Sequence, residues 1–264
     1  MNFIQPSIDP VILSLGFIDI RWYSLAYIIG LFLGLIIIKK LNKLKGELIR
    51  ETHIDNFFIW AVIGVILGGR IGYVLFYQTN LFLNDPVYIF KIWNGGMSFH
   101  GGLFGVILSI LIFCKINNLK FYYLSDLVSA VAPIGLFLGR IANFINTELI
   151  GRPTEFFISV VYPNIDNLPR HPSQLYEAFF EGLILFSILI FYFVKKSNIQ
   201  NYGFVSGLFL IFYALFRFII EFLREPDFQL GLFFDFISMG QILCIPLFIF
   251  GIILIKYNGY KKTN

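Results

Sequence analysis

Seven long apolar segments alternate with shorter polar stretches along the chain. Each is roughly 17 to 25 residues long, which suits an α-helix that crosses a hydrocarbon core about 30 Å thick. The segments are Arg21–Lys39, Phe57–Tyr77, Met97–Cys114, Tyr123–Phe144, Leu175–Phe193, Gly203–Leu223 and Phe234–Ile255. The pattern predicts an all-α fold, a polytopic membrane bundle of seven transmembrane helices.

The composition agrees with a membrane protein. Of the 264 residues, 58% are hydrophobic and only 14% are charged, and the mean hydropathy is +0.78. These values lie outside the range of soluble globular domains. No stretch looks like a soluble domain or a long linker, so we expect one integral membrane domain over residues 1–264. The first apolar segment has no small-residue cleavage site after it, so we expect no removable signal peptide.

Lysine and arginine divide unevenly between the two sides that seven spans define. The side of the carboxyl terminus carries 12 of the 20, namely Lys39, Lys40, Lys43, Lys45, Arg50, Lys115, Lys120, Lys195, Lys196, Lys256, Lys261 and Lys262. The opposite side carries five, namely Arg21, Lys91, Arg152, Arg170 and Arg224. The positive-inside rule predicts a cytoplasmic carboxyl terminus and an amino terminus outside. The basic residues are dispersed over short loops, which argues against a nucleic-acid partner.

Several chemistries lack a signature. The sequence has no HExxH, GxSxG or Walker motif, and these mark zinc proteolysis, serine nucleophiles and nucleotide phosphate loops. Three histidines and two cysteines without CxxC spacing do not indicate a metal centre or a disulfide framework. We therefore expect no metal and no cofactor.

Glycines and loop lengths organise the chain further. Glycines at four-residue spacing allow close helix packing in lipid, and they occur at Gly30/Gly34, Gly64/Gly68/Gly72, Gly101/Gly105, Gly135/Gly139 and Gly203/Gly207. The two outer connections Gln78–Gly96 and Asn143–Gln174 are longer and hold most of the loop polar residues. The functional site is therefore expected on the outer side.

His100 lies in the run GGMSFHGG at the start of the third span. Glycines permit unusual backbone angles and the close approach of another molecule. A neutral imidazole can accept a proton near neutral pH. His100 is therefore a candidate base, and the alternative is a histidine that only packs helices together.

A second polar cluster follows the fourth span in GRIANFINTELIGRP, with Arg140, Asn143, Asn146, Glu148, Gly151 and Arg152. Charged groups at membrane depth are costly and are retained mainly where they line a cavity or bind a ligand. Arg140 and Asn143 share one helical face, and a guanidinium there can bind a phosphate through two hydrogen bonds. The alternative is a structural ion pair between Arg140 and Glu148.

The sixth span carries a third polar group, made of Tyr213, Arg217, Glu221 and Arg224. At 100° per residue, all four lie within about 80° of one another on the helix. Arg217 and Glu221 either pair with each other or contribute to an anion site together with Arg140. Arg70 is a further candidate, and its alternative is a structural ion pair, for which Asp126 is the candidate partner.

Together these motifs resemble the prolipoprotein diacylglyceryl transferase family of bacterial cytoplasmic membranes. The resemblance covers about Arg21 to Asp227 and lies in RWYSLAY, GGRIGYVLFY, GGMSFHGG, GRIANFINTELIGRPT, RHPSQLYE and YALFRFIIEFLREPD. It implies seven membrane helices and a site that opens to the outer leaflet of the bacterial inner membrane. Arg21 occupies a position that is often histidine in the family, so it is assigned no role.

The resemblance also implies an activity. Such enzymes transfer the diacylglyceryl group of phosphatidylglycerol to the lipobox cysteine thiol of preprolipoproteins, which gives a thioether and glycerol 1-phosphate. It implies catalytic roles for His100, Arg140 and Arg217. Substrate-binding positions would be Tyr23, Arg140, Asn143, Glu148, Gly151, Tyr213, Arg217 and Glu221. The expected partners are phosphatidylglycerol, lipobox-containing preprolipoproteins and membrane lipids.

Two other classes of protein stay open at this point. Buried arginines and seven spans also suit a transporter or channel for an anionic or lipid-like solute, although no internal repeat or ladder of ion ligands is visible. A lipid-binding scaffold without catalysis is the third reading. Flux in liposomes and release of glycerol phosphate distinguish the three.

Overall fold

The computed structural model describes residues 3–16, 19–91, 93, 95–195, 202–226, 232–233 and 236–260. Six helical segments in this part of the chain are long and apolar enough to cross a membrane. They are α1 (Trp22–Leu44), α2 (Glu51–Tyr77), α4 (Phe99–Ile116), α5 (Phe121–Ile145), the continuous run Ser173–Lys195, and α9 over Met239–Tyr257 of its full extent Met239–Tyr260. A further apolar helix, α8 (Phe204–Ile220), has 17 residues. The chain is therefore a mostly helical, multi-pass membrane protein.

The helices agree with six predicted spans in place, and their ends differ by several residues. The second span was predicted from Phe57, but α2 begins at Glu51. The last span was predicted from Phe234, but α9 begins only at Met239. Phe234 itself lies outside the described residues, as do Lys196, Lys261 and Lys262 of the topology count. The helix begins where it does because Ser238 caps it, as described below.

Contacts divide the chain into two compact units, Ile38–Leu127 on one hand and Met1–Ile37 with Val128–Asn264 on the other. Helices α1 and α5 each run from one unit into the other. The sequence predicts that the whole chain forms a single membrane domain, in which these two units would associate, and this stays a prediction.

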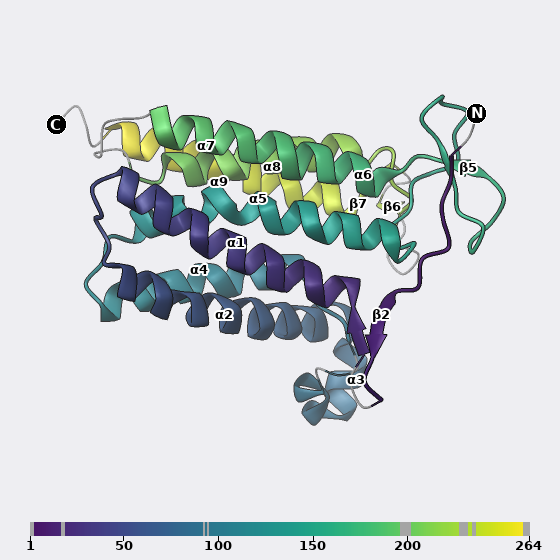
Figure 1. Cartoon of the computed structure of the whole chain (residues 1–264), viewed down its shortest axis with the longest axis horizontal. Coiled ribbons are helices and arrows are strands. Elements are labelled where there is room, and N and C mark those ends of the chain that lie inside the picture. The colour runs from purple at the N-terminus through teal and green to yellow at the C-terminus, as the bar shows by residue number, and fades with distance from the viewer. Residues whose placement is uncertain are drawn as a thin grey trace. The chain divides into compact units, whose positions relative to one another are not determined.

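In the unit Ile38–Leu127, α2 and α4 pack along each other (Figure 1) through their glycines. A Cβ atom added at Gly72 would lie 2.7 Å from the Cα atom of Gly101, and one at Gly68 would lie 2.8 Å from that of Gly105. These separations leave no room for side chains. The predicted use of glycines for close helix packing is confirmed here. The outer connection of this unit folds into α3 (Thr79–Asn84) and the 3-10 helix η1 (Pro86–Phe90).

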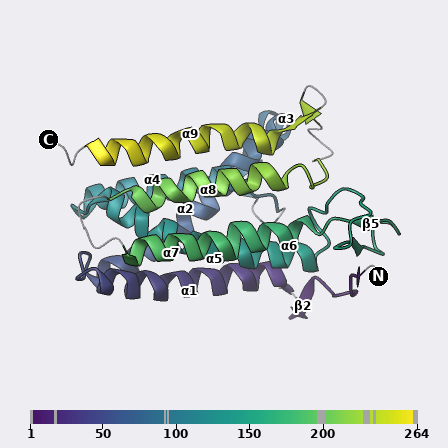
Figure 2. The ribbon, with the colours of Figure 1, turned by 90° about the horizontal axis from the view of Figure 1, so that it is seen from above.

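In the other unit, Figures 1 and 2 show α8 and α9 side by side. A Cβ atom at Gly207 would lie 2.6 Å from Cγ1 of Ile255, so the two helices touch closely at this level. The run Ser173–Lys195 consists of α6 (Ser173–Glu177), the π-helix η3 (Ala178–Ile184) and α7 (Leu185–Lys195). Gly182 of η3 packs against Phe137 of α5, where an added Cβ would lie 2.6 Å from the phenylalanine Cβ.

Short strands, which the hydrophobic pattern does not predict, lie ahead of α1 and in the connections between these helices. A three-stranded sheet joins β1 (Phe3–Ile4) in parallel to β4 (Val160–Val161), which pairs antiparallel with β5 (Pro169–Arg170). Two antiparallel pairs complete the set, namely β2 (Val11–Ser14) with β3 (Asp19–Arg21), and β6 (Leu232–Phe233) with β7 (Ile237–Ser238).

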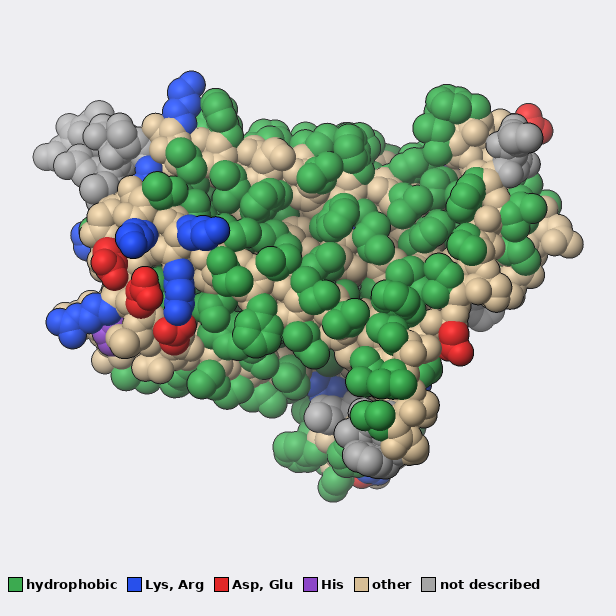
Figure 3. All heavy atoms as spheres, in the orientation of Figure 1, with side chains coloured by type: hydrophobic (Ala, Val, Ile, Leu, Met, Phe, Trp, Pro, Cys, Tyr) green, Lys and Arg blue, Asp and Glu red, His purple; other side chains and the backbone are tan. Residues whose placement is uncertain are grey.

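The surface has the polarity of a membrane protein. Large apolar side chains project outward along the helices, including Phe32 of α1 at 55% exposure and Phe104 of α4 at 62%, and hydrophobic atoms dominate Figure 3. Charged side chains gather where α1 ends and α2 begins (Figure 3), and there Nζ of Lys39 lies 2.6 Å from Oδ1 of Asp55. Exposed apolar area of this extent suits a lipid environment.

Candidate active site

The chain that leaves α5 makes a tight turn that carries Glu148. Thr147 and Leu149, on either side of it, have φ angles of +59° and +56°, which lie in the left-handed region that residues other than glycine seldom adopt. Two residues of α6 hold the turn in place. Nε2 of Gln174 donates to the Glu148 carbonyl at 2.6 Å, and Oγ of Ser173 donates to the Leu149 carbonyl at 2.8 Å. Backbone strain of this kind persists where the surroundings over-determine it and often marks a functional site.

Asn143 connects Glu148 to the first turn of α1. Asn143 lies in the last turn of α5 and is 2% exposed. Its side-chain amide donates to Oη of Tyr23 and, at 3.1 Å, to Oε2 of Glu148. Three of the residues singled out in the sequence thus form one hydrogen-bonded group.

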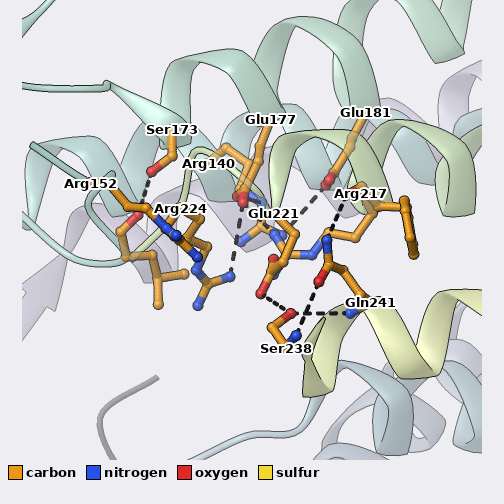
Figure 4. A network of polar contacts seen from close by, with 12 residues as sticks. Arg140, Arg152, Ser173, Glu177, Glu181, Arg217, Glu221, Arg224, Ser238 and Gln241 are labelled. Carbon is orange, nitrogen blue, oxygen red and sulfur yellow. Dashed lines mark hydrogen bonds and ion pairs between the residues drawn. The ribbon is translucent and has the colours of Figure 1, made fainter. Parts of the chain in front are cut away.

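Glu177 bridges two arginines that the sequence predicts as site residues (Figure 4). Its Oε2 atom lies 2.8 Å from Nε of Arg140, and its Oε1 atom pairs with Nη1 of Arg217. Glu177 is completely buried, whereas the side chains of Arg140 and Arg217 retain 15% and 11% exposure. The guanidinium groups of α5 and α8 are thus held together by a carboxylate of α6.

Further ion pairs extend this buried cluster. Oε2 of Glu221 lies 2.6 Å from Nη2 of Arg217, so the ion pair, one of the two readings of the sixth span, is present. The anion site stays a prediction. Oε2 of Glu181 lies 3.5 Å from Nη2 of Arg140, and Nη1 of Arg224 lies 3.9 Å from Glu177. Charges are tolerated at membrane depth when they pair in this way.

Gly151 lies in the connection Asn143–Gln174, called the outer loop after its predicted side, at the point where this loop crosses two other segments. Its N–H donates to the His171 carbonyl at 3.1 Å, and it forms an isolated antiparallel bridge with Arg224. A Cβ atom at this position would lie 2.7 Å from the Cβ atom of His171. Only glycine therefore allows the loop to approach so closely. Nε of Arg152 donates to the Arg224 carbonyl at 2.9 Å and secures the same crossing.

Arg170 anchors the outer loop. Its guanidinium contacts both carboxylate oxygens of Asp166, with Nη2 at 2.6 Å from Oδ2, and Nη1 lies 2.5 Å from Oε2 of Glu225. Nη1 also donates to the Gly151 carbonyl at 3.1 Å. The hydrogen bond from Arg170 lowers the pKa of Asp166. Burial lowers the pKa of the neighbouring His171, which favours a neutral imidazole in the loop.

The sequence matches the family model described as prolipoprotein diacylglyceryl transferase over residues 10–257. The chain belongs to this family. Similar proteins named phosphatidylglycerol–prolipoprotein diacylglyceryl transferase include those of Rickettsia felis, Rickettsia bellii and Rickettsia canadensis. The first is 49% identical over 97% of this chain and 99% of its own length. The second is 50% identical over 95% of each chain, and the third is 50% identical over 98% of this chain and 100% of its own.

Membership of the diacylglyceryl transferase family confirms the resemblance that the motifs indicate. The alternative of an ion pair between Arg140 and Glu148 does not hold. Arg140 pairs with Glu177 and Glu181 instead. The carboxylate of Glu148 instead accepts hydrogen bonds from Asn143 and, at 3.5 Å, from Asn146.

Sequence reasoning missed Glu177 and Glu181. Both lie inside the predicted span Leu175–Phe193, and an ionisable residue within a span is a site candidate by itself. That signal was present in the sequence. The π-helix that begins at Ala178 and carries Glu181 has no comparable signal, although such bulges are frequent at functional sites.

His100 lies in the first turn of α4, in the unit Ile38–Leu127. Its ring packs edge-on against Phe99 with the centroids 5.5 Å apart. The glycines around it have architectural reasons, since Gly96 has a φ angle of +85° and Gly101 packs against α2. They therefore do not by themselves indicate substrate approach, and the catalytic role of His100 stays a prediction.

Two other predicted positions have clear surroundings. Tyr213 is 4% exposed in α8, one turn before Arg217, and its ring stacks on Phe209 with the centroids 5.8 Å apart. All three guanidinium nitrogens of Arg70 donate to backbone carbonyls, including that of Ile89 at 3.1 Å from Nε. Arg70 thus ties down the outer connection of its unit. Among the described residues, no three His, Cys, Asp or Glu side chains group as metal ligands.

Proposed function

We propose that this protein transfers the diacylglyceryl group of phosphatidylglycerol to the lipobox cysteine thiol of preprolipoproteins, the first step of lipoprotein maturation. Family membership and near full-length identity of about half with relatives of that name support this function. The structural observation that carries the proposal is the pair of guanidinium groups of Arg140 and Arg217 held by Glu177. Two such groups suit a lipid phosphate, because guanidinium forms paired hydrogen bonds with phosphate oxygens.

In the proposed reaction, the cysteine sulfur attacks the carbon of the diacylglyceryl group that bears the phosphate. A carbon–sulfur bond forms, the carbon–oxygen bond to the phosphate breaks, and glycerol 1-phosphate leaves with the electron pair. Negative charge grows on the leaving phosphate, and Arg140 and Arg217 stabilise it in a water-poor site. Tyr23, Asn143, Glu148, Gly151, Tyr213 and Glu221 shape and orient the substrate-binding side.

The thiol must lose its proton before or during attack. A free cysteine has a pKa of about 8.5, so most of it is protonated at pH 7. We assign His100 as the base that accepts this proton, because imidazole is the side chain best matched to that pH. Glycerol 1-phosphate and the thioether then account for all atoms of the two substrates.

The same proposal includes the topology. Seven helices span the bacterial inner membrane, with α8 as the shortest of them. A 17-residue helix rises about 25 Å, and the turn that follows Ile220 extends the segment toward Leu223. The amino terminus and the active site face outward and the carboxyl terminus is cytoplasmic, as the lysine and arginine distribution suggests.

The decisive experiment measures glycerol phosphate release by the protein in phosphatidylglycerol liposomes with a lipobox peptide. We expect release to require the peptide cysteine, so a Cys→Ser peptide gives none. Arg140→Ala is expected to lower the rate at least about 100-fold, as loss of a charge-stabilising donor does in other enzymes. Arg50→Ala, which alters an exposed arginine at the start of α2, is the control and should keep the rate. Equal release by Arg140→Ala and the unmodified chain would exclude the phosphate role.

A further inference from the structure

The amino end of α9 holds a buried polar group that the proposed reaction does not use. The backbone N–H of Gln241 donates to Oγ of Ser238 at 3.2 Å, and the backbone N–H of Ser238 donates to Oε1 of Gln241 at 3.0 Å. This reciprocal pair is a capping box, which fixes the first turn of a helix. Ser238 and Gln241 are only 5% and 2% exposed, although a cap needs no burial. The buried pair also makes a second contact, with Glu221.

The hydroxyl of Ser238 makes this contact, because it lies 2.9 Å from Oε1 of Glu221. A serine hydroxyl has one hydrogen to donate. Because its oxygen accepts from Gln241, the hydrogen is directed at Glu221. The other carboxylate oxygen of Glu221 lies 2.6 Å from Nη2 of Arg217. A continuous chain of contacts thus runs from the cap of α9 to the arginine (Figure 4).

Gly240, in the first turn of α9, packs directly against the Glu221 carboxylate. A Cβ atom built on it would lie 2.9 Å from Oε1 and 3.0 Å from Cδ of Glu221. The carboxylate therefore rests directly against the backbone of the first turn. Any side chain at position 240 would push Glu221 away from its place between Ser238 and Arg217.

Glu221 needs such support because of its own position. It follows Ile220, the last residue of α8, at the C-cap, where the backbone leaves the regular helix. A glutamate side chain can adopt several staggered rotamers. Hydrogen bonding by Ser238 and contact with Gly240 select one of them.

We propose that Ser238, Gly240 and Gln241 are positioning residues for Arg217, acting through Glu221. This inference rests on the proposed function, in which Arg217 holds the lipid phosphate. The first turn of α9 holds the Glu221 carboxylate in place, and this carboxylate in turn sets the direction of the Arg217 guanidinium. Displacement of a binding group by about 1 Å can cost about 100-fold in rate. The three positioning residues therefore contribute to transfer without touching the substrate.

Three substitutions of Ser238 separate positioning from capping. Ser238→Thr keeps both the cap acceptor and the donor, and it should keep transfer. Ser238→Ala loses both, and kcat for glycerol phosphate release should fall about 10-fold to 100-fold. Ser238→Asp retains a good N-cap, but it offers no hydrogen to Glu221 and adds a like charge. The aspartate variant should therefore transfer slowly although it keeps the acceptor for the cap.

Gly240→Ala gives an independent test. Alanine is a better helix former than glycine, so α9 itself is not weakened, and a fall in kcat must come from displacement of Glu221. Gly135→Ala is the matched control, because an added Cβ there meets no atom within 4 Å. Full transfer activity in Ser238→Asp or in Gly240→Ala would overturn the proposal.

Retention of phosphatidylglycerol by the detergent-purified protein, measured by mass spectrometry of bound lipid, keeps the two proposals distinct. If the unmodified chain transfers nothing, the proposed function fails. Ser238→Ala should nevertheless retain several-fold less phosphatidylglycerol than Ser238→Thr. Equal retention by these two variants would overturn the positioning role whatever the outcome for transfer.

Discussion

Nε of Arg140 lies 2.8 Å from Oε2 of Glu177, and that carboxylate is completely buried. The same side chain pairs through its other oxygen with Arg217. Two positive groups from distant parts of the chain would repel each other at this depth without it. Glu177 therefore sets the separation of the two arginines, and its loss should affect both.

Substitution Glu177→Gln tests this relationship. The neutral amide leaves two buried guanidinium groups without their shared counter-charge, and removing one partner of a buried ion pair costs about 3 to 5 kcal/mol. We expect glycerol phosphate release to fall below about 1% and the thermal unfolding temperature to drop. Glu181→Gln is the comparison, because Glu181 contacts Arg140 only at 3.5 Å and should cost less. Equal effects of the two variants would contradict the bridging role of Glu177.

The base assignment predicts a specific pH response for His100→Asn. Loss of a general base typically lowers a rate by about 100-fold to 10,000-fold, and we expect a loss in this range at pH 7. Raising the pH toward 9 ionises the peptide thiol without help, so the variant should regain part of its rate while the unmodified chain gains little. Initial rates of release between pH 6 and 9 measure this. His53→Asn is the control, and an unchanged pH profile in His100→Asn would refute the assignment.

Gly151→Ala should disturb the crossing of the outer loop. The added Cβ would lie 2.7 Å from that of His171, and overpacking of this kind costs about 1 to 3 kcal/mol. We expect a lower unfolding temperature together with at least about 10-fold slower transfer, because the same loop carries Glu148. Gly135→Ala has open space around its Cβ and should behave as the unmodified chain in both assays. A Gly151→Ala variant with normal stability would show that the loop can move aside.

The pair of Asp166 and Arg170 predicts how stability depends on pH. The pKa of Asp166 is lowered in the folded chain by its hydrogen bonds with Arg170, so the contribution is present above the unfolded value near 3.9 and is lost as the pH falls through the folded value. Asp166→Asn should cost about 1 kcal/mol or less at pH 7, because the carboxylate is partly exposed. Unfolding temperatures at pH 7 and pH 3 measure the difference, which should shrink at pH 3. A difference independent of pH would mean that charge plays no part.

The hydrophobic pattern was sufficient for the helices, because membrane thickness sets their length whatever their neighbours are. It was not sufficient for their ends. The start of the last helix depends on the capping hydrogen bonds of Ser238 and Gln241. An average of hydropathy over many residues does not detect such individual contacts. The short strands escaped prediction because their pairing joins remote residues, as Phe3 pairs with Val160.

The same distinction holds for the site. The pairing of Arg217 with Glu221 follows from helical periodicity, so the sequence offered it as one of two readings. The pairing of Arg217 with Glu177 joins residues 40 positions apart and depends on how α6 packs beside α8. Helical periodicity therefore predicts contacts within an element, and it leaves open which elements meet.

The buried cluster is electrically neutral as a set of formal charges. It combines the arginines Arg140, Arg217 and Arg224 with the glutamates Glu177, Glu181 and Glu221. Under the proposed function, a lipid phosphate would bring one additional negative charge into this balance. Its oxygens would have to compete with the carboxylates for the same guanidinium hydrogens, so we infer that binding is an exchange of anions. On this view, the glutamates occupy the place of the headgroup phosphate between turnovers and keep the arginines apart and oriented.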